Sequence, residues 1–283
     1  MKKVLIVLAS LSLVVGSAMA QKASDLNPNA GHHQTNQTGD NQGNNDDGSS
    51  NQAGKAAGRG QLINHGGGVM NGGKVVCIFW GSIPASYYQN MQAFRSNSNG
   101  MVSHMGMLTQ YGVTESTLVG SQADVFDPTP PSSARVTDIM VMQEVARTVG
   151  FNANTNTVYE VFIPNGYYSD DGSGATSCGG PNLQYCAYHS WGDGVYLGSN
   201  VKYSIEPWPS CSGCSWSGWT TNQNANHFMV HETREALTDP KGSSWYDSAG
   251  YEADDKCAWQ GLFIQNGYGY QPEYSNSARN CVQ

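Results

Sequence analysis

Charged residues are scarce in this sequence. Lysine and arginine number 14 and aspartate and glutamate 22 in 283 residues, so charged types make up 13% of the chain, about half the usual share. The basic residues form no cluster longer than Lys2-Lys3. Because nucleic-acid binding needs basic side chains to neutralise phosphates, this composition argues against DNA or RNA as a partner.

Long apolar runs are also missing. After residue 20, no run reaches the roughly 20 residues that a membrane-spanning helix needs. The shorter run at residues 4–15 follows Lys2 and Lys3 and precedes the small residues 16–20. This order is typical of a secretory signal peptide that is cleaved before Gln21. We therefore expect a secreted protein, extracellular or periplasmic, without a membrane span.

Residues 21–60 lack aromatic side chains and have few aliphatic ones. Asn, Gln, Gly, Ser and Asp dominate this segment. Such a composition cannot bury enough apolar surface to offset the entropy lost on ordering. The sequence thus predicts a disordered leader, either an inhibitory propeptide or a spacer, before a single folded domain at residues 61–283.

The folded part is rich in aromatic residues, with 15 Tyr and 7 Trp in the whole chain. Its apolar residues follow the helical period in some segments and form short strand-like runs in others, which predicts a mixed α/β (α+β) domain with irregular loops. Buried strands are expected at 74–80 and 158–163, extended segments at 185–190 and 201–205, and helices at 85–95, 101–111 and 137–149.

All seven cysteines follow the signal segment. In an oxidising compartment they would form up to three disulfides and leave one thiol. We expect Cys178 and Cys186 to pair with each other or with Cys211 and Cys214. Cys257 should pair with Cys281, and Cys77, inside an apolar strand, should be the buried free thiol.

The segment 227–240 carries the strongest chemical signal. It is expected to be a helix that is capped by Asn222 or Asn224 and stopped by Pro240. Residues 231 and 235 then project about 40° apart, one turn from each other. His231 and Glu235 could hold a zinc ion, with Glu232 as the general base, as in the His-Glu-x-x-His pattern. The alternative is that these side chains bind no metal and only form ordinary pairs with neighbouring side chains on the helix surface.

Two other places could complete such a site. The acidic segment 245–257 contains Glu252, Asp254 and Asp255, which could supply a third zinc ligand, a calcium site or merely a solvated turn. His189 lies on a short extended segment. It could be a ligand, a stabiliser of a developing oxyanion or a hydrogen-bonded structural residue.

Several short motifs together resemble a known family. In order from about Asn64 to Cys257, they resemble the Exordium-like, or phosphate-induced, secreted proteins, the bacterial members above all. The motifs are His65-Gly66-Gly67-Gly68-Val69-Met70, the strand at 75–81, Cys186-Ala187-Tyr188-His189-Ser190, Cys211-Ser212-Gly213-Cys214-Ser215-Trp216, and the helix from His231-Glu232 to Thr238-Asp239-Pro240.

The resemblance has consequences for the site. In the bacterial relatives, a His-Glu-x-x-Glu helix is followed by a Glu-x-Gly-Asp-Lys-Cys turn, which corresponds here to Glu252 and Asp255, with Asp254 in place of the glycine. Plant members lack the His-Glu pair. Because the family fold does not need that pair, its presence favours a metal site in this chain.

These signals together predict a secreted, zinc-dependent hydrolase of metallopeptidase type with a zincin-like fold. Zinc, with calcium as the alternative, would be held by His231 and Glu235 together with Asp255 or Glu252. Glu232 would act as general base and then as proton donor, and His189 would stabilise the developing oxyanion or serve as a ligand, with an extracellular peptide or protein as substrate.

Two rival functions remain open from the sequence. One is a non-catalytic module that binds cell-wall glycans through Trp208, Trp216 and Trp219, although these side chains could equally pack around the cysteines. The other keeps the metal as a purely structural ion.

Deletion of residues 21–60 should shift the thermal midpoint of unfolding little, because the segment contributes almost no apolar surface. Calorimetry of the parent and truncated proteins tests this. A large fall in the midpoint would mean that the leader packs on the domain.

Overall fold

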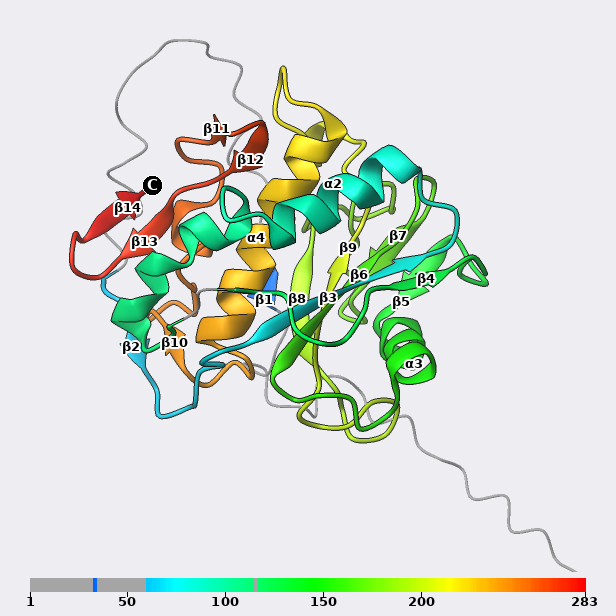
Figure 1. Ribbon diagram of the computed structural model, residues 1–283, viewed down its shortest axis with the longest axis horizontal. Helices are drawn as coiled ribbons and strands as arrows, with labels where there is room; N and C mark the ends of the chain where they lie inside the picture. The colour runs from blue at the N-terminus through cyan, green and yellow to red at the C-terminus, as the bar shows by residue number, and fades with distance from the viewer. Residues whose placement is uncertain (1–32, 35–59, 115–116) are drawn as a thin grey trace, which may run out of the picture.

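The computed structural model describes residues 33–34, 60–114 and 117–283 (Figure 1). The expected signal peptide at 1–20 and nearly all of the expected leader at 21–60 lie outside the described residues. Within the leader, His33 and Gln34 form a short strand that pairs with His189 and Tyr188. Within the described ranges, no helix is long and apolar enough to cross a membrane.

A six-stranded sheet forms the centre of the fold (Figure 1). Three of its inner strands, at 74–80, 157–162 and 202–206, are parallel to one another and almost entirely buried, which explains their largely apolar sequences. β8 and β1 are each antiparallel to the neighbouring strand. In spatial order the strands are β1 (His33–Gln34), β8 (Tyr188–Trp191), β9 (Lys202–Glu206), β6 (Thr157–Phe162), β3 (Lys74–Trp80) and β4 (Val125–Asp127).

Four two-stranded sheets surround the central one. Together with the helices they give a mixed α/β architecture, as the sequence predicts. The pairs are β2 (Ile63–Asn64) with β10 (Trp245–Tyr246), β5 (Arg135–Thr137) with β7 (Tyr168–Asp170), β11 (Phe263–Gln265) with β12 (Tyr268–Tyr270), and β13 (Glu273–Ser275) with β14 (Asn280–Val282).

Helices cover both faces of the central sheet, and each face has its own core. Alternate residues of β3 belong to different cores, because successive side chains of a strand point to opposite faces of the sheet. Cys77 and Phe79 pack with α2 (Ala85–Ser96) and α4 (Thr221–Thr238). Val76 and Ile78 pack with α3 (Asp138–Val149).

Most expected elements are confirmed with small changes of boundary, but the helix expected at 101–111 is wrong. That segment forms two 3₁₀ helices, η2 (Met101–His104) and η3 (Gly106–Tyr111). Glycines at 100, 106 and 112 flank these short turns, and glycine disfavours a continuous helix. Two further short 3₁₀ helices are η4 (Ser212–Cys214) and η5 (Asp255–Cys257).

The N-terminus of α4 also differs from the prediction. The cap is Thr220, not Asn222 or Asn224, so the helix begins at Thr221. Thr220 and Gln223 form a reciprocal capping box, in which the Thr220 hydroxyl accepts from the Gln223 amide and the Gln223 side chain accepts from the Thr220 amide. Asn224 instead accepts a hydrogen bond from the backbone of Trp216.

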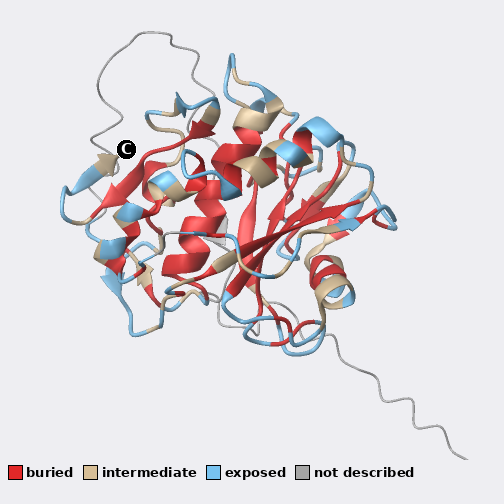
Figure 2. Ribbon diagram, in the orientation of Figure 1, coloured by how far each residue is buried: buried red, intermediate tan, exposed pale blue. Residues whose placement is uncertain are grey.

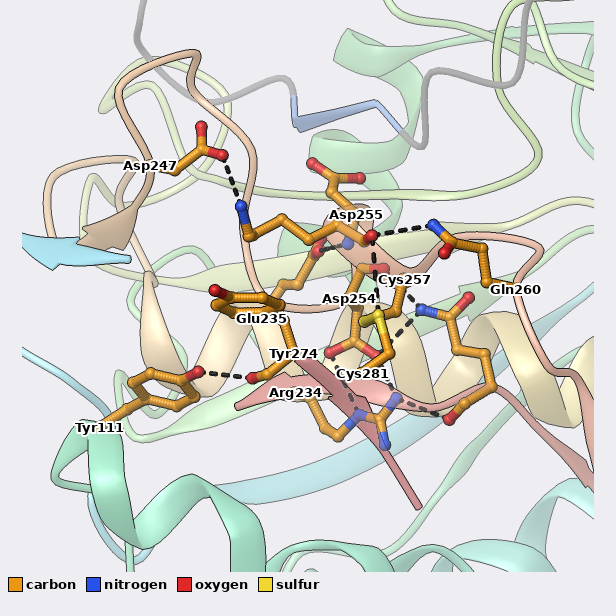
Figure 3. Close-up of a disulfide and its surroundings, with 12 residues drawn as sticks. Tyr111, Arg234, Glu235, Asp247, Asp254, Asp255, Cys257, Gln260, Tyr274 and Cys281 are labelled. Carbon is orange, nitrogen blue, oxygen red and sulfur yellow. Dashed lines mark hydrogen bonds and ion pairs between the residues drawn. A yellow bond between two sulfur atoms is a disulfide. The ribbon is translucent and has the colours of Figure 1, made fainter. Parts of the chain in front are cut away.

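The disulfides agree with the sequence prediction. Cys178 pairs with Cys211, Cys186 with Cys214, and Cys257 with Cys281, while Cys77 is free and buried. The Cys186–Cys214 bond joins the start of β8 to the loop before α4. The Cys257–Cys281 bond joins the acidic segment to the C-terminal hairpin (Figure 3).

Helix α4 runs through the interior, and every residue from Asn224 to Thr238 is buried (Figure 2). Its polar side chains therefore need partners inside the protein. Arg234 forms an ion pair with Asp254 (Figure 3). The Arg234 Nε also lies 3.7 Å from Glu273 Oε2. The ion pair with Asp254 fixes the acidic segment against the helix. Asp254 has ordinary right-handed backbone angles, so the turn does not require the glycine of the resembling family.

Arg234→Met should destabilise the protein by about 3–5 kcal/mol, because it leaves the Asp254 and Glu273 carboxylates buried without a cation. Lys241→Met is the control. This exposed lysine donates a hydrogen bond of 3.1 Å to Asn200, so its loss should cost about 0.5 kcal/mol or less. Urea unfolding measures both variants, and equal effects would contradict this account.

Candidate metal centre

Three side chains of the candidate site come from two successive turns of α4. His231 and Glu235 are one turn apart and lie on nearly the same side of the helix. Glu232 follows His231 and projects toward β8, where its Oε2 lies 3.4 Å from His189 Nδ1. The helical spacing predicted from the sequence is therefore present.

His189 reaches the site from the central sheet. A straight row crosses the strands from Cys77 through Glu160 and Ser204 to His189, each in register with the next. Residues in register on neighbouring strands point to the same face. Glu160 accepts a hydrogen bond of 2.6 Å from the Thr233 hydroxyl on α4, so this face is the one that α4 covers. The strand β8 thus directs His189 toward the helix.

The acidic segment supplies two further carboxylates. Asp255 donates its backbone amide to Glu235 Oε1 at 3.0 Å, which holds the start of η5 against α4. A buried ion pair of 2.8 Å between Lys256 and Asp247 stabilises the same segment from its other side (Figure 3). Glu252 lies three residues before Asp255, and its Oε2 is 3.8 Å from His189 Nε2.

Donor atoms from five of these residues form two groups. Within each group, the donor atoms all lie within 4.8 Å of one another. One group is His231, Glu235 and Asp255, and the other is His189, Glu235 and Glu252. His231 Nε2 is 3.3 Å from Glu235 Oε2 and 3.7 Å from Asp255 Oδ1. In the second group, Glu235 Oε2 is 3.8 Å from His189 Nδ1. Histidine nitrogen and carboxylate oxygen together are the donor set of many zinc sites.

The cluster is shielded from solvent. The two histidines are 1% exposed, while Glu232, Glu235 and Glu252 are fully buried. Among the described residues, neither ring nitrogen of His231 nor Glu235 Oε2 nor Glu232 Oε1 makes a hydrogen bond. Each buried polar atom without a partner costs about 1–3 kcal/mol, so the arrangement is one that a cation would stabilise.

Burial and mutual repulsion shift the acid–base properties of these groups. Burial, followed by the charge of Asp255, raises the pKa of Glu235 to about 8. Burial also raises the pKa of Glu232 and of Glu252 well above the usual carboxyl value. For His231, burial alone would lower the pKa, but the charges of Glu235 and Glu232 outweigh it and hold the pKa well above normal. Carboxylates that repel one another in this way favour a bound cation or a bound proton.

The other buried histidine of α4 behaves differently. His227 donates from Nε2 to Gln271 Oε1 at 2.7 Å, and burial lowers its pKa to about 3. It belongs to neither donor group. His227 is therefore a neutral structural histidine, and it provides a natural control for His231 and His189.

Two buried glutamates behind the site, Glu160 and Glu206, are not among the residues predicted from the sequence. Glu160 and Glu206 are buried on β6 and β9, and burial, followed by the charges of Glu160 and Glu232, raises the pKa of Glu206. Glu160 accepts hydrogen bonds from the hydroxyls of Ser204 and Thr233. A glutamate inside the apolar run 158–163 was the available signal for this polar layer.

Two of the three tryptophans of the glycan-binding alternative pack on buried aromatic rings. Trp208 stacks on Tyr87 at 4.4 Å between ring centroids. Trp219 meets His227 edge-on at 6.4 Å. Only Trp216 is largely exposed, at 41%, and it stacks on Trp259.

A third group of possible ligands, Cys178, Cys211 and Cys214, cannot bind metal in the oxidised protein, because all three thiols are in disulfides.

No known protein family, no curated protein and no solved structure matches this chain. The resemblance to the Exordium-like proteins therefore stays a prediction. The geometry of the site is the basis for its interpretation.

The raised pKa values predict how stability depends on pH when metal is removed. Because the folded state favours the protonated form of Glu235, its contribution is complete below pH 4.5 and is lost as the pH rises through about 8. Glu232, Glu252 and His231 change stability in the same direction. In EDTA, the thermal midpoint should therefore fall across this window.

Zinc should reverse the trend, since binding requires deprotonated ligands and its stabilisation grows with pH. Calorimetry at several pH values with EDTA or with zinc checks both parts. If zinc does not change the thermal midpoint of unfolding at any pH in this range, the proposal that these residues bind metal is contradicted.

Proposed function

We propose that the protein is a secreted metal-dependent hydrolase of metallopeptidase type, with a zincin-like arrangement of helix and sheet. The observation that carries this proposal is the convergence of His231, Glu235 and Asp255 in a buried site beside Glu232. Three protein ligands and a neighbouring carboxylate are the parts that a catalytic zinc site needs. The three disulfides fit an oxidising extracellular or periplasmic location.

The donor set favours zinc over calcium. Calcium prefers six to eight oxygen ligands, whereas each donor group here includes one histidine nitrogen. A zinc ion at this place would supply a water with a pKa lowered to about 7 and would polarise a carbonyl group.

Glu232 would act as the general base. Its Oε2 faces His189, whereas Oε1 has no hydrogen-bond partner among the described residues and can accept a proton from water. The adjacent His189 holds the carboxylate in position. After the attack, the same carboxylate would pass the proton to the leaving amine.

A peptide substrate is favoured by the edge of the sheet. β1 pairs antiparallel with β8, with His33 opposite His189. β8 therefore pairs with an extended backbone next to the candidate centre, and a peptide substrate would take the position that β1 occupies here. Addition of a strand to a sheet edge is a common way to bind peptides.

Glycan binding is supported by a single observation, the exposed Trp216 stacked on Trp259. One exposed indole can stack on a sugar ring, but it leaves the buried ligand cluster unexplained. We therefore keep this function second.

Glu232→Gln should lower any peptide hydrolysis by about two to four powers of ten and leave the zinc content unchanged, because glutamine keeps the size of the side chain but cannot accept the proton. His231→Ala should lower both hydrolysis and zinc content, because it removes a ligand. Kinetics with a broad peptide library and elemental analysis measure the two effects.

Glu144→Gln is the matched control, since this buried glutamate lies on α3, across the sheet. It should keep both hydrolysis and zinc. If Glu232→Gln cleaves peptides as fast as the parent protein, the hydrolase assignment is wrong and the glycan-binding function moves to first place.

A further inference from the structure

The two donor groups of the centre share one residue, Glu235. We propose that the centre binds two metal ions, with Glu235 between them. One ion would be held by His231 and Asp255 and the other by His189 and Glu252. The proposal uses the same centre as the proposed hydrolase, but the number of bound ions can be measured without any activity.

The composition of the two groups is the first argument. Each consists of one histidine, one carboxylate of its own and Glu235. His231 and Glu235 come from α4, His189 from β8, and Glu252 and Asp255 from the acidic segment. The two groups therefore offer the same donor set, one nitrogen and two carboxylates, to two separate ions.

The position of Glu235 is the second argument. Its Oε2 is 3.3 Å from His231 Nε2 and 3.8 Å from His189 Nδ1, so it lies within reach of both histidines. This oxygen is fully buried and has no hydrogen bond within the described part of the chain. Oε1 is held by the Asp255 amide at 3.0 Å, which fixes the orientation of the carboxylate.

Charge is the third argument. Ionised Glu232, Glu235, Glu252 and Asp255 carry four negative charges in a nearly solvent-free site. One divalent ion would leave two of these carboxylates to be neutralised by protons, because burial of unpaired charge is strongly unfavourable. Two divalent ions with neutral histidine ligands balance them.

A centre with two ions also has a chemical consequence. Paired ions can stabilise the attacking oxygen and the polarised substrate oxygen together, which suits hydrolysis of an unactivated amide bond. His189 is then a metal ligand as well as the neighbour of Glu232.

The test is the zinc stoichiometry of the full secreted protein, measured by native mass spectrometry and elemental analysis after dialysis against zinc. The parent should bind two ions. His189→Ala should bind one, and His227→Ala, which changes a buried histidine outside both groups, should bind two. Glu252→Gln should reproduce the loss caused by His189→Ala.

A measurement on the parent alone guards against variants that fail to fold. With Mn²⁺ in place of zinc, two ions that share a carboxylate give a spin-coupled electron paramagnetic resonance signal. Only an isolated-ion signal at saturation, or one zinc per parent chain, would overturn the proposal.

The outcomes separate this proposal from the proposed function. Two ions without any hydrolysis would keep the two-ion centre and remove the hydrolase. One ion, with hydrolysis that depends on Glu232, would keep the hydrolase and remove the second site.

Discussion

The structure depends on the burial of four carboxylates and two histidines in one small volume. Charges of one sign repel strongly where water is excluded, so this cluster is stable only if a cation or protons compensate it. Other buried charges of the same region have partners. Arg234 contacts Asp254, and Lys256 contacts Asp247. The buried charges around the cluster thus form ion pairs with lysine or arginine. The donor atoms of His231 and Glu235 instead lie close to each other inside the cluster.

The scaffold explains how such a cluster is held together. The helix α4, the strand β8 and the acidic segment meet there, and each is fixed by a contact outside the cluster. The Cys186–Cys214 and Cys257–Cys281 disulfides fix the chain near β8 and behind the acidic segment, respectively. The hydroxyl of Thr233 ties α4 to Glu160 on the sheet. Ligands that are positioned before the ion binds lose little conformational entropy on binding.

Local patterns in the sequence predict the parts of this site that depend on local geometry. The spacing of His231, Glu232 and Glu235 follows from the helical period, and the apolar run at 74–80 predicts the strand β3. The cysteine pairs agree with the prediction because each lies in a loop-rich stretch. Contacts between segments that are distant in the sequence could not be predicted in this way. The ion pair of Arg234 with Asp254 and the row from Cys77 to His189 depend on strand order, which no local pattern encodes. The 3₁₀ helices at 101–111 differ from the prediction because apolar spacing does not distinguish them from an α-helix.

The proposed binding of a metal ion by His231, Glu235 and Asp255 can be observed in an anomalous difference map at the zinc absorption edge, from crystals of the protein grown with zinc. We expect a strong peak at about 2.0–2.2 Å from His231 Nε2 and from a carboxylate oxygen of Glu235. Zinc peaks only at surface histidines, with none between α4 and the acidic segment, would contradict the proposal.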